Sequence, residues 1–135
     1  MSFSISNGSE YITFDVVRYY EELYEPLACY ALRIHGAVDF LQFDQECFAF
    51  AKALQELYSQ MQNAYQTLSG TVCMDSFHYD SNFSLQMKFD KTGNVLVHAS
   101  MRGICASNTA CDMEFTTDQT FVQKTLRDMK ETLGF

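Results

Sequence analysis

Apolar and polar side chains alternate along most of the chain, and this period of two is typical of strands with one buried face. Residues 83–89 give the clearest case, because every second side chain in them is apolar. The same period, interrupted by turn-forming residues, predicts about six strands, at 11–17, 30–35, 71–79, 83–89, 95–102 and 111–115. The last four follow one another through short connections, which favours antiparallel pairing.

Two further segments have the three-and-four spacing of an amphipathic helix. The first is expected to begin at Asp44, a good N-cap, and to end at Gly70. The second is expected to begin at Thr117 or Asp118 and to end at Gly134. The apolar stripe of the first helix consists of Cys47, Ala51, Leu54, Tyr58, Met61, Tyr65 and Leu68, and that of the second of Val122, Leu126, Met129 and Leu133.

Together these elements predict an α+β fold in the order β-β-α-β-β-β-β-α. We expect a two-layer sandwich, in which two helices cover one face of an antiparallel sheet of about six strands. The chain has 135 residues. A domain usually takes about 100–200 residues, so residues 1–135 are expected to form a single domain.

The charge of the chain narrows the kinds of partner that it can have. It has 17 acidic and 9 basic residues and a formal net charge of −8. This balance argues against nucleic acid, because phosphate binding needs clustered Lys and Arg. The first eight residues have no secretory pattern, and the chain has no run of about 18 apolar residues. We therefore expect no membrane span and a cytoplasmic location, while a homo-oligomer formed through an uncovered sheet face stays open.

No motif in the sequence points to a cofactor, a metal ion or a catalytic residue. The six glycines are dispersed, without the Gly-x-Gly of a phosphate-binding loop. His35, His78 and His98 belong to no local zinc-binding pattern. The five cysteines include no Cys-x-x-Cys, which favours buried thiols in a reducing compartment over disulfides. A bridge between Cys105 and Cys111 is the alternative.

A hydrolytic or small-ligand-binding domain of the same class is the alternative to a protein-binding function. It needs a pocket between the sheet and the helices, lined by convergent polar groups. Its candidate residues are Cys73, Asp75, His78 and His98, because a cysteine nucleophile needs a base and an orienting group close in space. The four residues would have to meet in one cavity.

One surface segment is richer in tyrosine and glutamate than the rest of the chain. It ends at the only proline, Pro26, and is expected to be a long hairpin connection. Tyrosine supplies a large contact area and carboxylates attract basic partners, so the segment is a candidate partner-binding site. The alternative is a solvated loop whose tyrosines fold back over the sheet edge. The candidate partner-binding residues are Tyr19, Tyr20, Glu21, Glu22, Tyr24 and Glu25.

The overall layout resembles that of the WapI-like immunity proteins of bacterial polymorphic-toxin systems. The resemblance consists of a long first hairpin, a helix entered through residues 36–44, a strand meander, and a last helix entered through residues 114–120. The tryptophan positions of the family have no counterpart, because the chain has no tryptophan. The resemblance implies a cytosolic, non-enzymatic protein that binds and blocks a toxin domain. A basic toxin domain would be attracted by the net charge of the chain.

Overall fold

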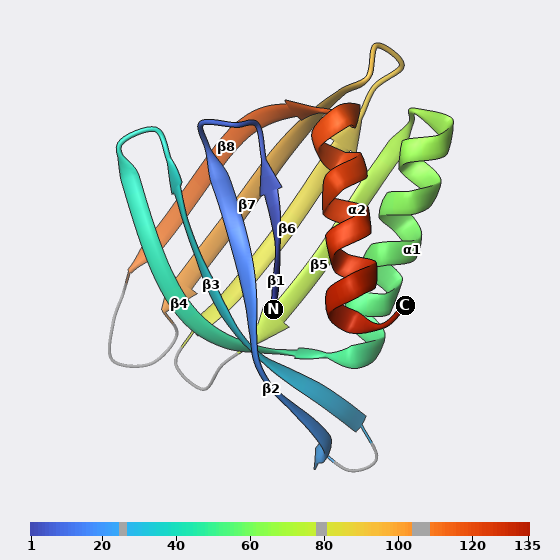
Figure 1. Ribbon diagram of the computed structural model, residues 1–135. Helices are drawn as coiled ribbons and strands as arrows, with labels where there is room; N and C mark the ends of the chain where they lie inside the picture. The colour runs from blue at the N-terminus through green and yellow to red at the C-terminus, as the bar shows by residue number, and fades with distance from the viewer. Residues whose placement is uncertain (25–26, 78–80, 104–108) are drawn as a thin grey trace.

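A computed structural model of the protein describes residues 1–24, 27–77, 81–103 and 109–135. These residues form eight strands and two helices, and the strands pair in the order in which they follow one another along the chain (Figure 1). The elements are β1 (Ser2–Ser6), β2 (Tyr11–Tyr24), β3 (Leu27–Val38), β4 (Leu41–Phe50), α1 (Ala51–Thr67), β5 (Gly70–Phe77), β6 (Ser81–Phe89), β7 (Asn94–Gly103), β8 (Ala110–Asp118) and α2 (Gln119–Leu133).

The strands make two four-stranded antiparallel sheets, β1–β4 and β5–β8. Pairing within each sheet is extensive, whereas β4 and β5 are joined by a single residue pair, Phe48 with Phe77. The predicted α+β class is confirmed. The single sheet of about six strands and the order β-β-α-β-β-β-β-α are wrong, because four strands precede α1.

The two strands that the sequence analysis missed, β1 and β4, are a short segment and an ambiguous one. β1 spans only five residues, although its Phe3 and Ile5 alternate with serines and are buried. The sequence predicts Asp44 as a helix N-cap, but Asp44 lies opposite His35 in the β3–β4 ladder. Cys47 matches a helical stripe as well as a strand face, so the helical period of α1 also fits part of β4.

The buried stripe of α1 differs from the predicted one. Its buried residues are Leu54, Leu57, Met61 and Ala64, so only Leu54 and Met61 were predicted, while Tyr58 and Tyr65 flank the core. Of the other predicted residues, Cys47 lies in β4, Ala51 is half-buried, and Leu68 follows the helix, which ends at Thr67 and not at Gly70. The second helix agrees closely with the prediction. The carboxylate of Asp118 accepts hydrogen bonds from the N–H groups of Thr120 and Phe121, at 2.9 and 3.3 Å. Gly134 ends the helix with a φ of 75° and donates its N–H to the Lys130 carbonyl.

The core lies between the two sheets and is closed by the helices. The ring of Phe14 stacks on Phe3 of β1 at 4.9 Å and meets Phe83 of β6 edge-on at 5.8 Å, so it connects the sheets. The helices lie side by side, α2 along β1 and α1 along β5 (Figure 1).

Each helix also satisfies backbone groups at the strand that it covers. The hydroxyl of Thr125 donates to the Ser4 carbonyl of β1 at 2.6 Å, and that of Thr132 donates to the Ser2 carbonyl at 3.1 Å. The Cys73 N–H of β5 donates to the side-chain oxygen of Gln60 at 3.3 Å. The helices therefore protect two strand edges that would otherwise be open to pairing with another chain.

Candidate functional site: the outer face of β2, β3 and β4

The first sheet has a solvent-facing side, here called the outer face. Ile12 and Phe14 of β2 are buried, so the alternation of the strand turns their neighbours to the opposite side. The same holds for β3, in which Leu32 and Ile34 point to the core. The outer face is made of Tyr11, Thr13, Asp15, Arg33, His35, Gln42, Asp44 and Glu46.

A salt bridge and a histidine–carboxylate hydrogen bond cross the strands of the outer face. The guanidinium of Arg33 binds the Asp44 carboxylate with two hydrogen bonds, one of them 2.8 Å long between Nε and Oδ1. The hydrogen bond from Arg33 lowers the pKa of Asp44, and the pair raises the pKa of the arginine. Asp44 is thus ionised at neutral pH, and its contribution to stability is lost only as the pH falls through this lowered pKa. The Nε2 atom of His35 lies 2.8 Å from Asp15 Oδ2.

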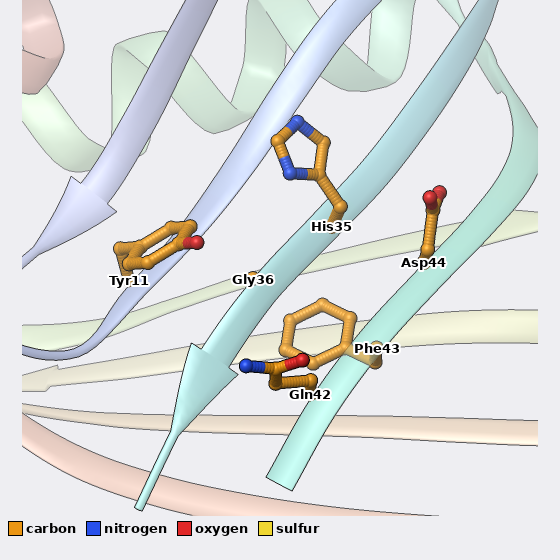
Figure 2. Close-up of a pocket in the computed structure, with 6 residues that line it drawn as sticks. All are labelled: Tyr11, His35, Gly36, Gln42, Phe43 and Asp44. Carbon is orange, nitrogen blue, oxygen red and sulfur yellow. The ribbon is translucent and has the colours of Figure 1, made fainter.

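A hollow of about 350 Å³ opens on the outer face beside these pairs (Figure 2). It is lined by Tyr11, His35, Gly36, Gln42, Phe43 and Asp44. A Cβ atom on Gly36 would lie 2.1 Å from the Tyr11 carbonyl oxygen and 2.8 Å from Phe43 Cζ. The glycine therefore allows β2 to approach and the Phe43 ring to pack across the strand. The lining offers hydrogen-bond donors and acceptors over an aromatic floor and includes no cysteine, serine or threonine nucleophile.

A second hollow, of about 320 Å³, lies farther along the same strands. It is lined by Val17, Arg18, Tyr20, Ala31, Leu32, Glu46, Cys47 and Phe48. The register of β2 shifts between Val16 and Arg18, so Val17 is an extra residue in the strand and is exposed. The Arg18 guanidinium lies 4.9 Å from the centre of the Tyr20 ring, which in turn meets Phe48.

The tyrosine- and glutamate-rich segment lies next to this second hollow, but it is not a hairpin connection. β2 continues to Tyr24 and pairs with β3 there, so this part of the sequence interpretation is wrong. Tyr19 and Tyr30 lie opposite each other with their ring centres 4.9 Å apart, and such cross-strand aromatic pairs stabilise a hairpin. The end of β2 and the start of β3 project from the body of the molecule (Figure 1).

The structure describes the six candidate partner-binding residues to different extents. Tyr19 and Glu21 are exposed, and Tyr20 is half-buried. Glu22 and Tyr24 are placed by their backbone in β2, and Glu25 lies outside the described residues. Sequence reasoning missed the Arg33–Asp44 pair and the hollow of Figure 2, because both need β4 as a strand. The contact of His35 with Asp15 joins two predicted strands, but it depends on their pairing and register.

The candidate residues of the enzymatic alternative lie on the other sheet. Cys73, Asp75 and His98 are on the solvent-facing side of β5–β8, and His78 lies outside the described residues. Asp75 accepts a hydrogen bond from Ser84, and His98 Nε2 lies 3.6 Å from Asp112 Oδ1. The three described side chains are therefore not gathered in a pocket between sheet and helices. Among the described residues, no group of three or more His, Cys, Asp or Glu side chains could hold a metal ion.

The described cysteines are free thiols and differ in exposure. Cys29 and Cys47 are buried, Cys111 is half-buried and Cys73 is exposed, while Cys105 lies outside the described residues. Burial raises the pKa of the Cys47 thiol to about 11, although a hydrogen bond from Ser76 opposes the shift. Burial also raises the pKa of Cys29.

Alkylation should separate these thiols. At pH 8 only about one in a thousand Cys47 side chains is ionised at a pKa of about 11, and the thiolate is the reacting form. We expect iodoacetamide to modify Cys73 within minutes in the folded protein and to leave Cys29 and Cys47 unmodified, as read by peptide mass spectrometry. All three should react in urea. Modification of Cys47 as fast as Cys73 in the folded protein would contradict the described burial.

Comparison with known proteins assigns the chain to a family. The model of the immunity protein WapI-like family matches residues 3–134. The chain belongs to this family. No curated protein and no solved structure matches the chain. Within the described residues, none of the helices has the length and apolar character needed to cross a membrane.

Membership of the WapI-like family confirms the resemblance drawn from the layout of the chain. It also indicates the role, because an immunity protein neutralises a toxin. The match spans nearly the whole chain, so both sheets and both helices belong to the unit that carries this role. A toxin protein is accordingly the partner that the family implies.

Proposed function

We propose that the protein binds a toxin domain and blocks it by protein–protein contact in the cytoplasm, without catalysing a reaction. The observation that carries this proposal is the family match over residues 3–134. The outer face of β2–β4 is suited to binding a protein, because this face presents polar and aromatic groups on paired strands. Groups held in this way lose little freedom on binding.

We place the first contact at the projecting end of β2, with Tyr19, Tyr20, Glu21, Glu22, Tyr24 and Glu25 as the contacting residues. The glutamates would attract a basic toxin domain over long distance, as the net charge of −8 also favours. The tyrosines would supply contact area once the two proteins meet. The second hollow, between Val17 and Phe48, lies at the base of this segment and would receive a side chain of the toxin domain.

Reversing the three charges of the segment tests this placement. The triple variant Glu21→Lys, Glu22→Lys and Glu25→Lys should associate with the toxin domain about tenfold more slowly at low salt, because charges at an interface act mainly on the association rate. The difference should shrink as salt screens the charges. Surface plasmon resonance with the immobilised toxin domain measures both effects.

A matched control separates local contact from net charge. Reversing Asp75, Asp112 and Glu114, all exposed on the second sheet, also changes the net charge from −8 by +6 to −2. This control should slow association much less than the variant at the projecting end of β2. Equal slowing by both variants would reject that end as the contact, while leaving toxin binding itself intact.

A further inference from the structure

The turn between β3 and β4 presents the most exposed aromatic side chain among the described residues. Val38 pairs with Leu41, so the turn consists of Asp39 and Phe40 alone. Phe40 is 91% exposed. Asp39 has a φ of 56°, in the left-handed region that non-glycine residues seldom adopt. Phe40, the second residue of the turn, has no positive φ, so its backbone is open to most residue types and turn formation does not select an aromatic side chain there.

Exposure of one apolar side chain is common on protein surfaces and is by itself weak evidence for a binding site. What distinguishes Phe40 is the way its turn is held. The N–H of Asp39 donates to Glu10 Oε2 at 3.1 Å, and the other oxygen of that carboxylate accepts from the Asn7 side chain at 3.1 Å. Asn7 also donates to the Thr116 carbonyl of β8 at 3.0 Å. The β3–β4 turn is thereby tied to the β1–β2 turn and to the second sheet.

The charged groups at the turn itself are acidic. Asp39 lies in the turn, and the Glu10 carboxylate accepts a hydrogen bond from its N–H. Asp44, farther along β4, is already paired with Arg33 and adds little to this negative charge. An anionic lipid surface or a second copy of this acidic end would be repelled. A protein pocket with an apolar interior and a basic rim is the complementary surface.

We propose that Phe40 is an anchor that inserts into an apolar, basic-rimmed pocket of the toxin domain, and that Glu10 positions it. This proposal rests on the proposed function and adds a second contact to it, at the opposite end of β3 from the projecting hairpin. A preorganised aromatic side chain that fills a partner's pocket is the usual form of an energetic hot spot. The turn is held in place before binding, so little freedom remains to be lost.

Substitution of Phe40 tests the anchor. Phe40→Ser should weaken binding of the purified toxin domain about 30-fold, mainly through faster dissociation, and Phe40→Leu should recover most of the loss. The control is Leu96→Ser, at an apolar residue on the outer side of β7 that is 38% exposed. It should bind as the unmodified protein does. Unchanged binding by Phe40→Ser, or equal loss with Leu96→Ser, would overturn the proposal.

Substitution of Glu10 tests the positioning. Glu10→Ala should lower affinity although Phe40 is present, and it should remove the hydrogen-exchange protection of the Asp39 amide. Glu10→Gln keeps an oxygen acceptor and should restore both. If Glu10→Ala loses that protection but binds the toxin domain with full affinity, Glu10 does not position Phe40 for binding.

The same measurements separate the anchor from the proposed function. If the unmodified protein does not bind the toxin domain, the proposed function and the Phe40 anchor are both contradicted. If the unmodified protein binds and Phe40→Ser binds equally well, only the proposal that Phe40 is an anchor is contradicted. Light scattering on the unmodified protein and on Phe40→Ser completes the test, because a dimer that the substitution abolishes would place a second copy at Phe40 and overturn the assignment to the toxin.

Discussion

Replacing Phe14 by alanine is expected to lower the free energy of unfolding by about 3–5 kcal/mol. The side chain is fully buried and touches Phe3 in its own sheet and Phe83 in the other. Its removal leaves a cavity where the two sheets meet, in addition to the lost burial of apolar surface. Urea unfolding followed by circular dichroism gives the change.

The same substitution at Phe40 is the matched control for Phe14. Phe40 is 91% exposed, so Phe40→Ala should change the free energy of unfolding by less than about 0.5 kcal/mol. The pair separates burial from residue type. A loss below about 1 kcal/mol for Phe14→Ala would mean that the sheets do not pack through this residue. A large loss for Phe40→Ala would show that the turn contributes to the fold, and not only to binding.

Gly36→Ala is expected to destabilise the protein by about 3 kcal/mol, at the upper end of the usual range for overpacking. The added Cβ would meet the Tyr11 carbonyl oxygen at 2.1 Å, and this backbone atom can move only if β2 and β3 separate. Because Gly36 lines the hollow of Figure 2, the outer face should be disturbed as well. Thermal or urea unfolding measures the loss of stability.

Gly134→Ala is the control, because it adds the same methyl group with no atom within 4 Å. Its φ of 75° makes alanine there less favourable by about 1–2 kcal/mol. The two variants therefore separate a steric clash from backbone strain. Equal losses in both would contradict the close approach of Tyr11 to Gly36.

Local sequence patterns predicted the parts of the fold that depend on local rules. The alternation in residues 83–89 and the Asp118 and Gly134 caps of α2 agree with the structure, since strand faces and helix caps are decided by neighbours in sequence. Residues 44–50 fit two periods at once. Their strand conformation is decided by pairing with β3, for example Asp44 opposite His35, which a local pattern does not contain.

The candidate site was predictable to a smaller extent. The tyrosine- and glutamate-rich composition of residues 19–25 is visible in the sequence, but its place in a paired strand depends on Tyr30 and Cys29 of β3. The contact of Arg33 with Asp44 joins residues eleven positions apart, through a ladder that the sequence interpretation lacked. The bracing of Asp39 by Glu10 likewise depends on how two separate turns meet.

Isothermal titration calorimetry of the purified toxin domain with this protein tests the central claim most directly. The account predicts saturable binding at one protein per toxin domain, with no heat flow after each injection has equilibrated, because a blocking protein binds and does not turn over. Absence of saturable binding would contradict the account. So would a sustained heat flow at substoichiometric protein, since continuing heat is the signature of a catalysed reaction.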